Sequence, residues 1–236
     1  MKRLFRIIFL SAVLVTVVLV ACKRDKAPYI NFGYTYYPNT VGKYIIYDVE
    51  SIYSSSFDYK IDTVKYQLKE LVQSLFPDNS GRPTQRIERY VKSYDSATWV
   101  LRNVCTANVT STDAEKVENN VRYIKLVFPV ALNKFWNGNA YNTLGTWNYS
   151  YTAVDQPMSI NNQFFDSVLT VVQLGDSNVI SDSLYIERYA RNIGLVYKSV
   201  TAVTNDCTSL GTTGSLLGRQ YTTGIFKYSL TINSHN

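Results

Sequence analysis

Four glutamates are the side chains of this sequence that offer acid and base chemistry: Glu70, Glu88, Glu118 and Glu187. Each lies in or near a segment that alternates like a β-strand, so two of them could face each other across the mouth of a curved sheet. Glycoside hydrolases use such a pair of carboxylates. Strand carboxylates more often lie on the solvated face, and Glu88 has basic residues beside it. Glycoside hydrolysis is therefore a remote alternative, and we expect a protein that is not an enzyme.

Other catalytic side chains are few. The single histidine, His235, lies in a polar tail next to the last residue of the sequence, where it is a poor general base or metal ligand. Nucleophilic schemes that pair serine or cysteine with histidine therefore lack their base. No two cysteines are spaced closely enough for a zinc site, and the glycines at 211, 214 and 218 lack the lysine of a phosphate-binding loop. We expect no metal and no cofactor.

Segment 135–141 is the best candidate for contact with a ligand. It places amide side chains beside aromatic rings, a combination that suits a carbohydrate or a lipid head group, through Trp136, Asn137, Asn139 and Tyr141. In the alternative interpretation, Trp136 plugs one end of a barrel while the two asparagines shape a turn.

The first 22 residues have the order of a secretory signal. Three basic residues precede an apolar run from 7 to 20, and Ala21 and Cys22 follow. The apolar run is shorter than the roughly 20 residues that a membrane span needs, so a signal cleaved after residue 21 is favoured over an uncleaved anchor. Without the basic residues of this signal the chain has 21 basic and 18 acidic residues, a net charge of +3, and they are interspersed. Nucleic acid is therefore not expected as a partner.

Leu19-Val20-Ala21-Cys22 also resembles the lipobox of bacterial lipoproteins. The resemblance implies that lipid is attached to Cys22 and that the membrane is a partner through this anchor, without being spanned. Lys23 follows in place of the aspartate that retains enterobacterial lipoproteins at the inner membrane, so the expected location is the outer membrane. The side of that membrane on which the domain lies is left open.

Beyond the signal, residues 22–38 are expected to form the lipidated cysteine and a tether, and residues 39–236 a single β domain. All 20 tyrosines lie beyond Cys22, and apolar residues alternate with polar ones in rows such as Ile45-Tyr47-Val49 and Val64-Tyr66-Leu68. We predict an all-β fold of nine or ten mainly antiparallel strands in a strongly curved or closed sheet, a half-open barrel. Short helical turns are expected at 130–135 or 156–162. One long strand is expected at 116–128.

Three segments resemble uncharacterised envelope lipoproteins of Bacteroidota: Gly42-Lys43-Tyr44-Ile45-Ile46-Tyr47-Asp48, Phe128-Pro129 with Trp136-Asn137-Gly138-Asn139, and the segment from Tyr189 to Lys198. The last two are also similar to elements of curved half-barrel domains such as the carriers that move lipoproteins to the outer membrane. The resemblance implies a half-barrel architecture and says less about activity.

Four Asp-Ser or Asp-Thr pairs resemble the motif at which Bacteroidota glycosylate exported proteins. The resemblance implies candidate O-glycosylation at Thr63, Ser96, Ser167 and Ser183. The alternative is that these pairs mark turns before strands.

In an oxidising envelope compartment Cys105 and Cys207 could form a disulfide, or they could remain two buried thiols.

These observations favour a membrane-anchored lipoprotein whose non-catalytic β domain binds a hydrophobic or glycan ligand. That function requires an interior cavity of at least about 300 Å³. The alternative is a structural or assembly lipoprotein that contacts other envelope proteins.

Overall fold

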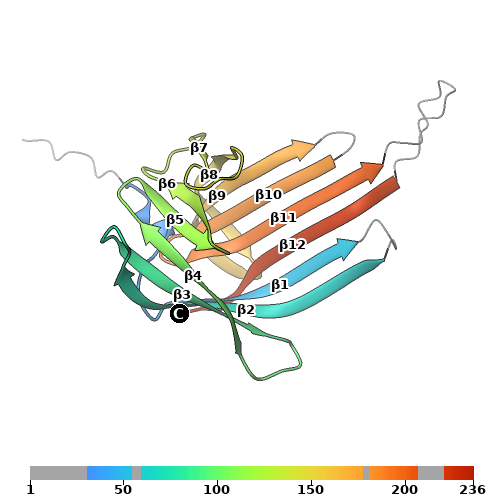
Figure 1. The fold of residues 1–236 in the computed structure, drawn as a ribbon, viewed down its shortest axis with the longest axis horizontal. Helices are drawn as coiled ribbons and strands as arrows, with labels where there is room; N and C mark the ends of the chain where they lie inside the picture. Colours follow the sequence, from blue (N-terminus) through green and yellow to red (C-terminus); the bar gives the residue numbers. More distant parts are fainter. Residues whose placement is uncertain (1–30, 55–59, 178–180, 207–220) are drawn as a thin grey trace, which may run out of the picture. The chain divides into compact units, whose positions relative to one another are not determined.

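Twelve strands form one antiparallel sheet in the computed structural model, which describes residues 31–54, 60–177, 181–206 and 221–236 (Figure 1). A short 3-10 helix, η1 (Tyr34–Tyr36), precedes them. The strands are β1 (Tyr44–Ser54), β2 (Ile61–Pro77), β3 (Pro83–Lys92), β4 (Val100–Val109), β5 (Asp113–Glu118), β6 (Val121–Val127), β7 (Phe135–Asn137), β8 (Asn148–Ile160), β9 (Gln163–Ser177), β10 (Ser181–Ala190), β11 (Gly194–Asp206) and β12 (Tyr221–His235).

The sheet consists of two meanders of six strands that meet at one long-range pair. Neighbours in the sheet are neighbours in sequence except where β12 pairs with β1, which places Val49 opposite Leu230. Figure 1 shows β9 to β12, β1 and β2 as long ribbons side by side, while β3 to β6 fold across them at one end. The predicted all-β, mainly antiparallel and nearly closed sheet is confirmed.

The outermost strands of the two meanders are brought together by a seam of hydrogen bonds. The backbone N–H of Ile124 in β6 donates to the carbonyl of Gly138 at 2.9 Å, and Trp136 Nε1 donates to the carbonyl of Ile124 at 3.0 Å. The Tyr151 hydroxyl accepts from the N–H of Val127 and donates to its carbonyl. This seam covers backbone groups at a sheet edge that would otherwise be open to pairing with another chain.

The number of strands exceeds the predicted nine or ten for two reasons. The single strand expected at 116–128 is a hairpin, β5 and β6, whose turn residues Asn119 and Asn120 have φ of 51° and 63°. Positive φ at both central residues is the pattern of a type I′ turn, which asparagine tolerates. The very short β7 adds a further strand.

The helical turns expected at 130–135 and 156–162 were wrong. Residues 130–134 form a turn that leads into β7, and residues 156–160 complete β8. Asn161 and Asn162, with φ of 50° and 61°, form the hairpin turn between β8 and β9. An antiparallel partner on β9 supplies the backbone hydrogen bonds that a helix would otherwise need.

The residues before β1 belong to the domain, so the predicted tether boundary at residue 38 was too late. The Tyr36 side chain is fully buried, and its hydroxyl donates to Asp155 Oδ1 at 2.5 Å and lies 2.8 Å from Ser167 Oγ. Residues 32–236 form one compact unit. Tyr37 also contacts the buried core.

Several predicted features lie outside the described residues, namely the signal at 1–21, the lipidation site Cys22 and the second cysteine, Cys207. These predictions are untested. Within the described part of the chain, no helix has the length and apolar character needed to cross a membrane.

Candidate functional site

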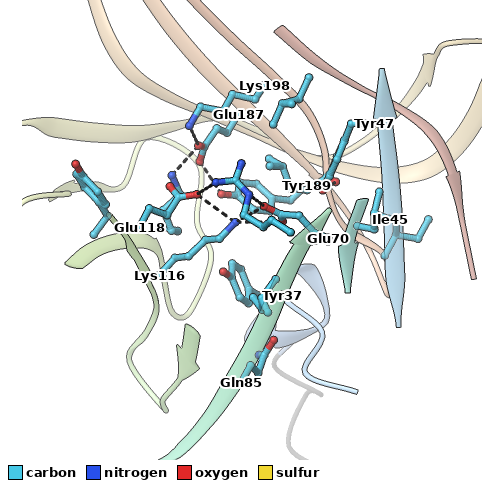
Figure 2. Close-up of a pocket in the computed structure, with 18 of the residues that line it drawn as sticks. Tyr37, Ile45, Tyr47, Glu70, Gln85, Lys116, Glu118, Glu187, Tyr189 and Lys198 are labelled. Atoms are coloured by element: carbon cyan, nitrogen blue, oxygen red, sulfur yellow. Dashed lines mark hydrogen bonds and ion pairs between the residues drawn. The ribbon is translucent and has the colours of Figure 1, made fainter. Parts of the chain in front are cut away.

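A cavity of about 660 Å³ lies inside the curved sheet, within the range of small-molecule sites (Figure 2). Its walls come from alternate residues of most strands, because successive side chains of a strand point to opposite faces. The apolar part of the lining is rich in aromatic rings and includes Tyr37, Ile45, Tyr47, Tyr149, Tyr185 and Tyr189. The volume exceeds the roughly 300 Å³ that a ligand-binding domain requires.

Seven ionisable side chains from six strands converge in this cavity, and we call them the charged belt. Its members are Glu70 on β2, Arg89 on β3, Lys116 and Glu118 on β5, Lys125 on β6, Glu187 on β10 and Lys198 on β11. Figure 2 shows the labelled members pointing toward one another, with ion pairs between them. Charges this far inside a domain are rare unless they are paired.

Glu187 is the most deeply buried member of the charged belt, with 1% of its side chain exposed. One carboxylate oxygen lies 2.6 Å from Lys125 Nζ and 3.1 Å from Lys198 Nζ. The other oxygen accepts a hydrogen bond of 2.6 Å from the Tyr189 hydroxyl. A single carboxylate therefore holds two lysines and one phenol on one side of the cavity.

Lys116 connects the remaining carboxylates. Its Nζ lies 2.9 Å from Glu70 Oε1 and 3.3 Å from Glu118 Oε1. Arg89 Nε lies 3.1 Å from Glu70 Oε1, yet the angle is poor and this N–H has no hydrogen-bond partner in the described structure. The negative charge of Glu70 therefore holds the Arg89 guanidinium, but the Nε–H group of Arg89 donates no hydrogen bond within the described structure.

The pKa values show that the three carboxylates of the belt are charged at neutral pH. Burial alone would raise the pKa of Glu187, but Lys125 and Lys198 lower it to about 2. Lys116 and neighbouring cations likewise outweigh burial and hold the pKa values of Glu70 and Glu118 below their ordinary value.

The lysines of the belt differ from one another. Burial would lower the pKa of Lys116, but Glu70 and Glu118 raise it well above its ordinary value. Burial lowers the pKa of Lys125, and repulsion from Lys198 adds to this effect despite Glu187. Lys125 is thus the one cation of the belt whose pKa lies below its ordinary value.

Two amide side chains in the cavity wall lack partners. Gln85 on β3 and Gln173 on β9 are only 2% and 4% exposed, and no hydrogen-bond partner for either Nε2 atom exists among the described residues. A buried polar group without a partner costs about 1–3 kcal/mol. Such a cost is commonly tolerated where a ligand completes the hydrogen bonds.

Three of the four glutamates proposed from the sequence line the cavity. Glu88 is on the outer face of β3, where it accepts hydrogen bonds from Arg86 and Tyr90. A glycosidase needs one carboxyl group with a raised pKa as its general acid. The belt carboxylates are Glu70, Glu118 and Glu187, and their lowered pKa values provide no such acid.

The predicted ligand-contact residues do not line the cavity, and their contacts match the alternative interpretation. Trp136 packs on Tyr149 and Tyr151 at the seam. Asn137 Oδ1 accepts hydrogen bonds from two backbone N–H groups, and Asn139 Nδ2 donates to the carbonyl of Gly145. The fourth residue, Tyr141, is exposed outside the cavity. The structure thus uses segment 135–141 to close the sheet.

The candidate modification sites lie in different surroundings. Thr63 is exposed on β2, while Ser96 and Ser183 are half-buried. Ser167 lies within β9 rather than before a strand, and its hydroxyl bonds to Asp155 at 2.5 Å, so a glycan there would break a packed network. Cys105 is buried, and the predicted disulfide stays a prediction because Cys207 is outside the described residues.

The sequence interpretation missed the four cations of the belt, although strand alternation contained a signal. Glu70 follows Tyr66 and Leu68 in the same inward row, and Arg89 lies between Ile87 and Val91 at the same spacing. A charged residue at an apolar position of a strand is therefore the pattern that marks this site.

In the described part of the chain, no group of three or more His, Cys, Asp or Glu side chains is arranged to hold a metal ion. No protein-family model matches this sequence, and comparison with curated proteins gives no match.

Proposed function

We propose that this protein is a lipid-anchored envelope lipoprotein, located at the outer membrane, whose β domain binds a hydrophobic ligand without catalysing a reaction. The observation that carries the proposal is the cavity of about 660 Å³, with its aromatic walls and unpartnered amides. Residues 1–22 support the anchor through the signal pattern and Cys22. A glycan ligand is less well supported, because the asparagines expected to hold it bond within the protein.

Ligand binding is tested with the neutral fluorophore N-phenyl-1-naphthylamine and the purified protein. Val200 on β11 lines the cavity, and the next residue, Thr201, points to the opposite face. Val200→Trp should fill the cavity and abolish the fluorescence enhancement, while Thr201→Trp should retain it. Equal enhancement with both variants, or none with the unmodified protein, would contradict binding in this cavity.

The anchor is tested separately by fractionation of cells that express Cys22→Ser. The variant should leave the membrane fraction and lose the mass of the attached lipid, because one thiol carries the anchor. Retention of the variant in the membrane at wild-type level would contradict lipidation at Cys22.

An assembly role remains a second candidate because two large rings are open to solvent. Phe135 and Phe164 are 71% and 67% exposed, and exposed aromatic side chains are common in protein interfaces. Cross-linking in intact cells should recover the same envelope protein from the wild type and lose it with Phe135→Ser and Phe164→Ser. Recovery of no protein would remove this candidate.

A further inference from the structure

The charged belt contains more positive than negative charge. Four cations face three carboxylates, and all seven groups line one cavity. Lys43 is a further cation of the lining, whereas no fourth acidic side chain belongs to it among the described residues. The field inside the cavity therefore favours one added negative charge.

The cavity also has an excess of hydrogen-bond donors. The buried side-chain atoms of its lining that lack a hydrogen-bond partner in the described structure are Gln85 Nε2, Gln173 Nε2 and Arg89 Nε, and all three are N–H groups, although Arg89 Nε forms an ion pair with Glu70. A ligand with acceptor oxygens would satisfy them, whereas an amine or ammonium would not. The hydrogen-bond argument and the charge argument therefore point to the same kind of head group.

An apolar path leads from the belt along the same face of the sheet. Val200 follows Lys198 in the inward row of β11 and lies opposite Tyr228 of β12. The next inward residue of β12 is Phe226, which lies opposite Tyr53 of β1, and both rings are 44% exposed. A chain that leaves the belt at Lys198 would meet only apolar or aromatic side chains at these positions.

A second hollow of about 450 Å³ lies against β2, β3 and the start of β4. Val64, Tyr66, Val91 and Val100 form its apolar part, and its lining also includes Lys92, Arg102 and the hydroxyl side chains of Ser93, Ser96 and Thr98. The apolar extension of the charged centre is therefore the row on β11, β12 and β1, and the two together are the arrangement that an amphiphile requires.

We infer that the ligand is an amphiphile with one anionic head group and an apolar chain. The head group lies beside Lys125 and Lys198, and the chain lies on the inner face of β11, β12 and β1. A carboxylate and a phosphate ester both provide the required acceptor oxygens and negative charge. This inference rests on the proposed function, because it assigns the chemistry of the ligand in the same cavity.

The test compares probes of equal chain length by displacement of N-phenyl-1-naphthylamine below their micelle concentrations. Palmitate should displace the fluorophore at concentrations at least about tenfold lower than hexadecanol or hexadecylamine, a difference of about 1.4 kcal/mol. Palmitoyl lysophosphatidylglycerol forms a further arm. If this lipid binds more tightly than palmitate, the head group of the ligand is a phosphate ester. If palmitate binds more tightly, the head group is a free carboxylate.

Two belt variants should change palmitate binding in opposite directions. Glu187→Gln removes the carboxylate that neutralises Lys125 and Lys198, so it should tighten palmitate binding about tenfold and leave hexadecanol unchanged. Lys198→Met should weaken palmitate binding by a similar factor. Glu50→Gln and Lys65→Met remove the members of an exposed ion pair and should change neither ligand.

A gain of affinity cannot result from misfolding, and near-ultraviolet circular dichroism verifies the fold of each variant. If Glu187→Gln does not fold, Glu70→Gln replaces it in the test. This substitution removes a carboxylate that pairs with Lys116, so it should also tighten palmitate binding about tenfold. Equal binding of palmitate and hexadecanol, unaffected by either variant, would overturn the anionic head group and leave hydrophobic binding intact. Failure of every probe to displace the fluorophore would contradict the proposed function itself.

Discussion

At the scale of single residues, the notable feature is a set of charges that the fold has buried at a cost. Removing an ion from water costs several kcal/mol even after relaxation, and ion pairing recovers that cost only with good geometry. Glu187 has such geometry with Lys125, whereas Arg89 and the amides of Gln85 and Gln173 do not have all their partners. Hydrophobic side chains of similar volume would fill the space with less penalty. We therefore attribute the burial of the charged belt to ligand binding and not to a contribution to the stability of the fold.

The lowered pKa of Glu187 predicts acid sensitivity. Because its pKa is about 2 in the folded protein and 4.5 in the unfolded chain, its ionised form stabilises the fold above about pH 4.5. This contribution, about 3 kcal/mol, should disappear as pH falls toward 2. Urea unfolding at a series of pH values should show a flatter profile for Glu187→Gln than for the wild type in this window. Parallel profiles would contradict the assignment.

At the scale of elements, the sheet depends on tight turns and on the seam between its two ends. Asparagine pairs at positive φ build the hairpins β5–β6 and β8–β9. The seam requires a close approach, since a Cβ atom at Gly138 would lie 2.3 Å from the Tyr149 ring. Only glycine at position 138 leaves room for the Tyr149 ring. Packing therefore explains the glycine in the Trp-Asn-Gly-Asn sequence of segment 136–139.

Substitution of Gly138 tests the seam. Gly138→Ala must displace the Tyr149 ring and should lower the free energy of unfolding by about 1–3 kcal/mol. Gly145→Ala is the matched control, because nothing lies within 4 Å of its added Cβ atom. Chemical denaturation of both variants measures the difference. A seam that tolerates both alanines equally would contradict the role assigned to Gly138.

The turn between β5 and β6 permits a second test at this scale. Asn120 has φ of 63°, so Asn120→Val should destabilise the protein by about 1–2 kcal/mol, whereas Asn120→Gly should be tolerated. Thermal unfolding followed by circular dichroism compares the two. Equal melting temperatures would show that the turn is not formed as described.

At the scale of the whole molecule, the pairing of β12 with β1 joins the two meanders. This pair aligns inward residues of strands that are about 180 positions apart in sequence, such as Val49 and Leu230. It also places Glu70, on the strand beside β1, in the same cavity as Lys198, on the strand beside β12. The cavity therefore exists only when both halves are joined.

Removal of β12 should consequently destroy the fold as a whole. A chain that ends at residue 206 leaves β1 and β11 without their partner, and we expect it to aggregate or unfold, because both become open edges. A chain that lacks only residues 235 and 236 is the control and should remain monomeric. Size-exclusion chromatography and circular dichroism compare them, and a cooperatively folded monomer of the shorter chain would contradict this account.

Much of the fold followed from local patterns. The alternating rows at Tyr47 and Val49 and at Tyr66 and Leu68 predicted two inward faces that the structure confirms, because the side-chain period of a strand is two. The asparagine pairs were overlooked as turns, so two strands were merged into one and a helical turn was expected where β8 ends. The same alternation carries Glu70 and Arg89 to inward faces, but the sequence interpretation did not recognise this.

The sequence by itself therefore determined the strand class and the inward rows, since each depends on neighbouring residues, while the secretory signal at the start of the chain stays a prediction. Only the tertiary structure decided which inward rows meet. Lys125 and Gln173 reach the cavity at β-bulges, where an extra residue shifts the register between Ile124 and Leu126 and between Val172 and Leu174. A bulge reverses the face on which later residues lie, and its position depends on the partner strand. For that reason the sequence alone could not place Lys125 and Gln173 in the cavity.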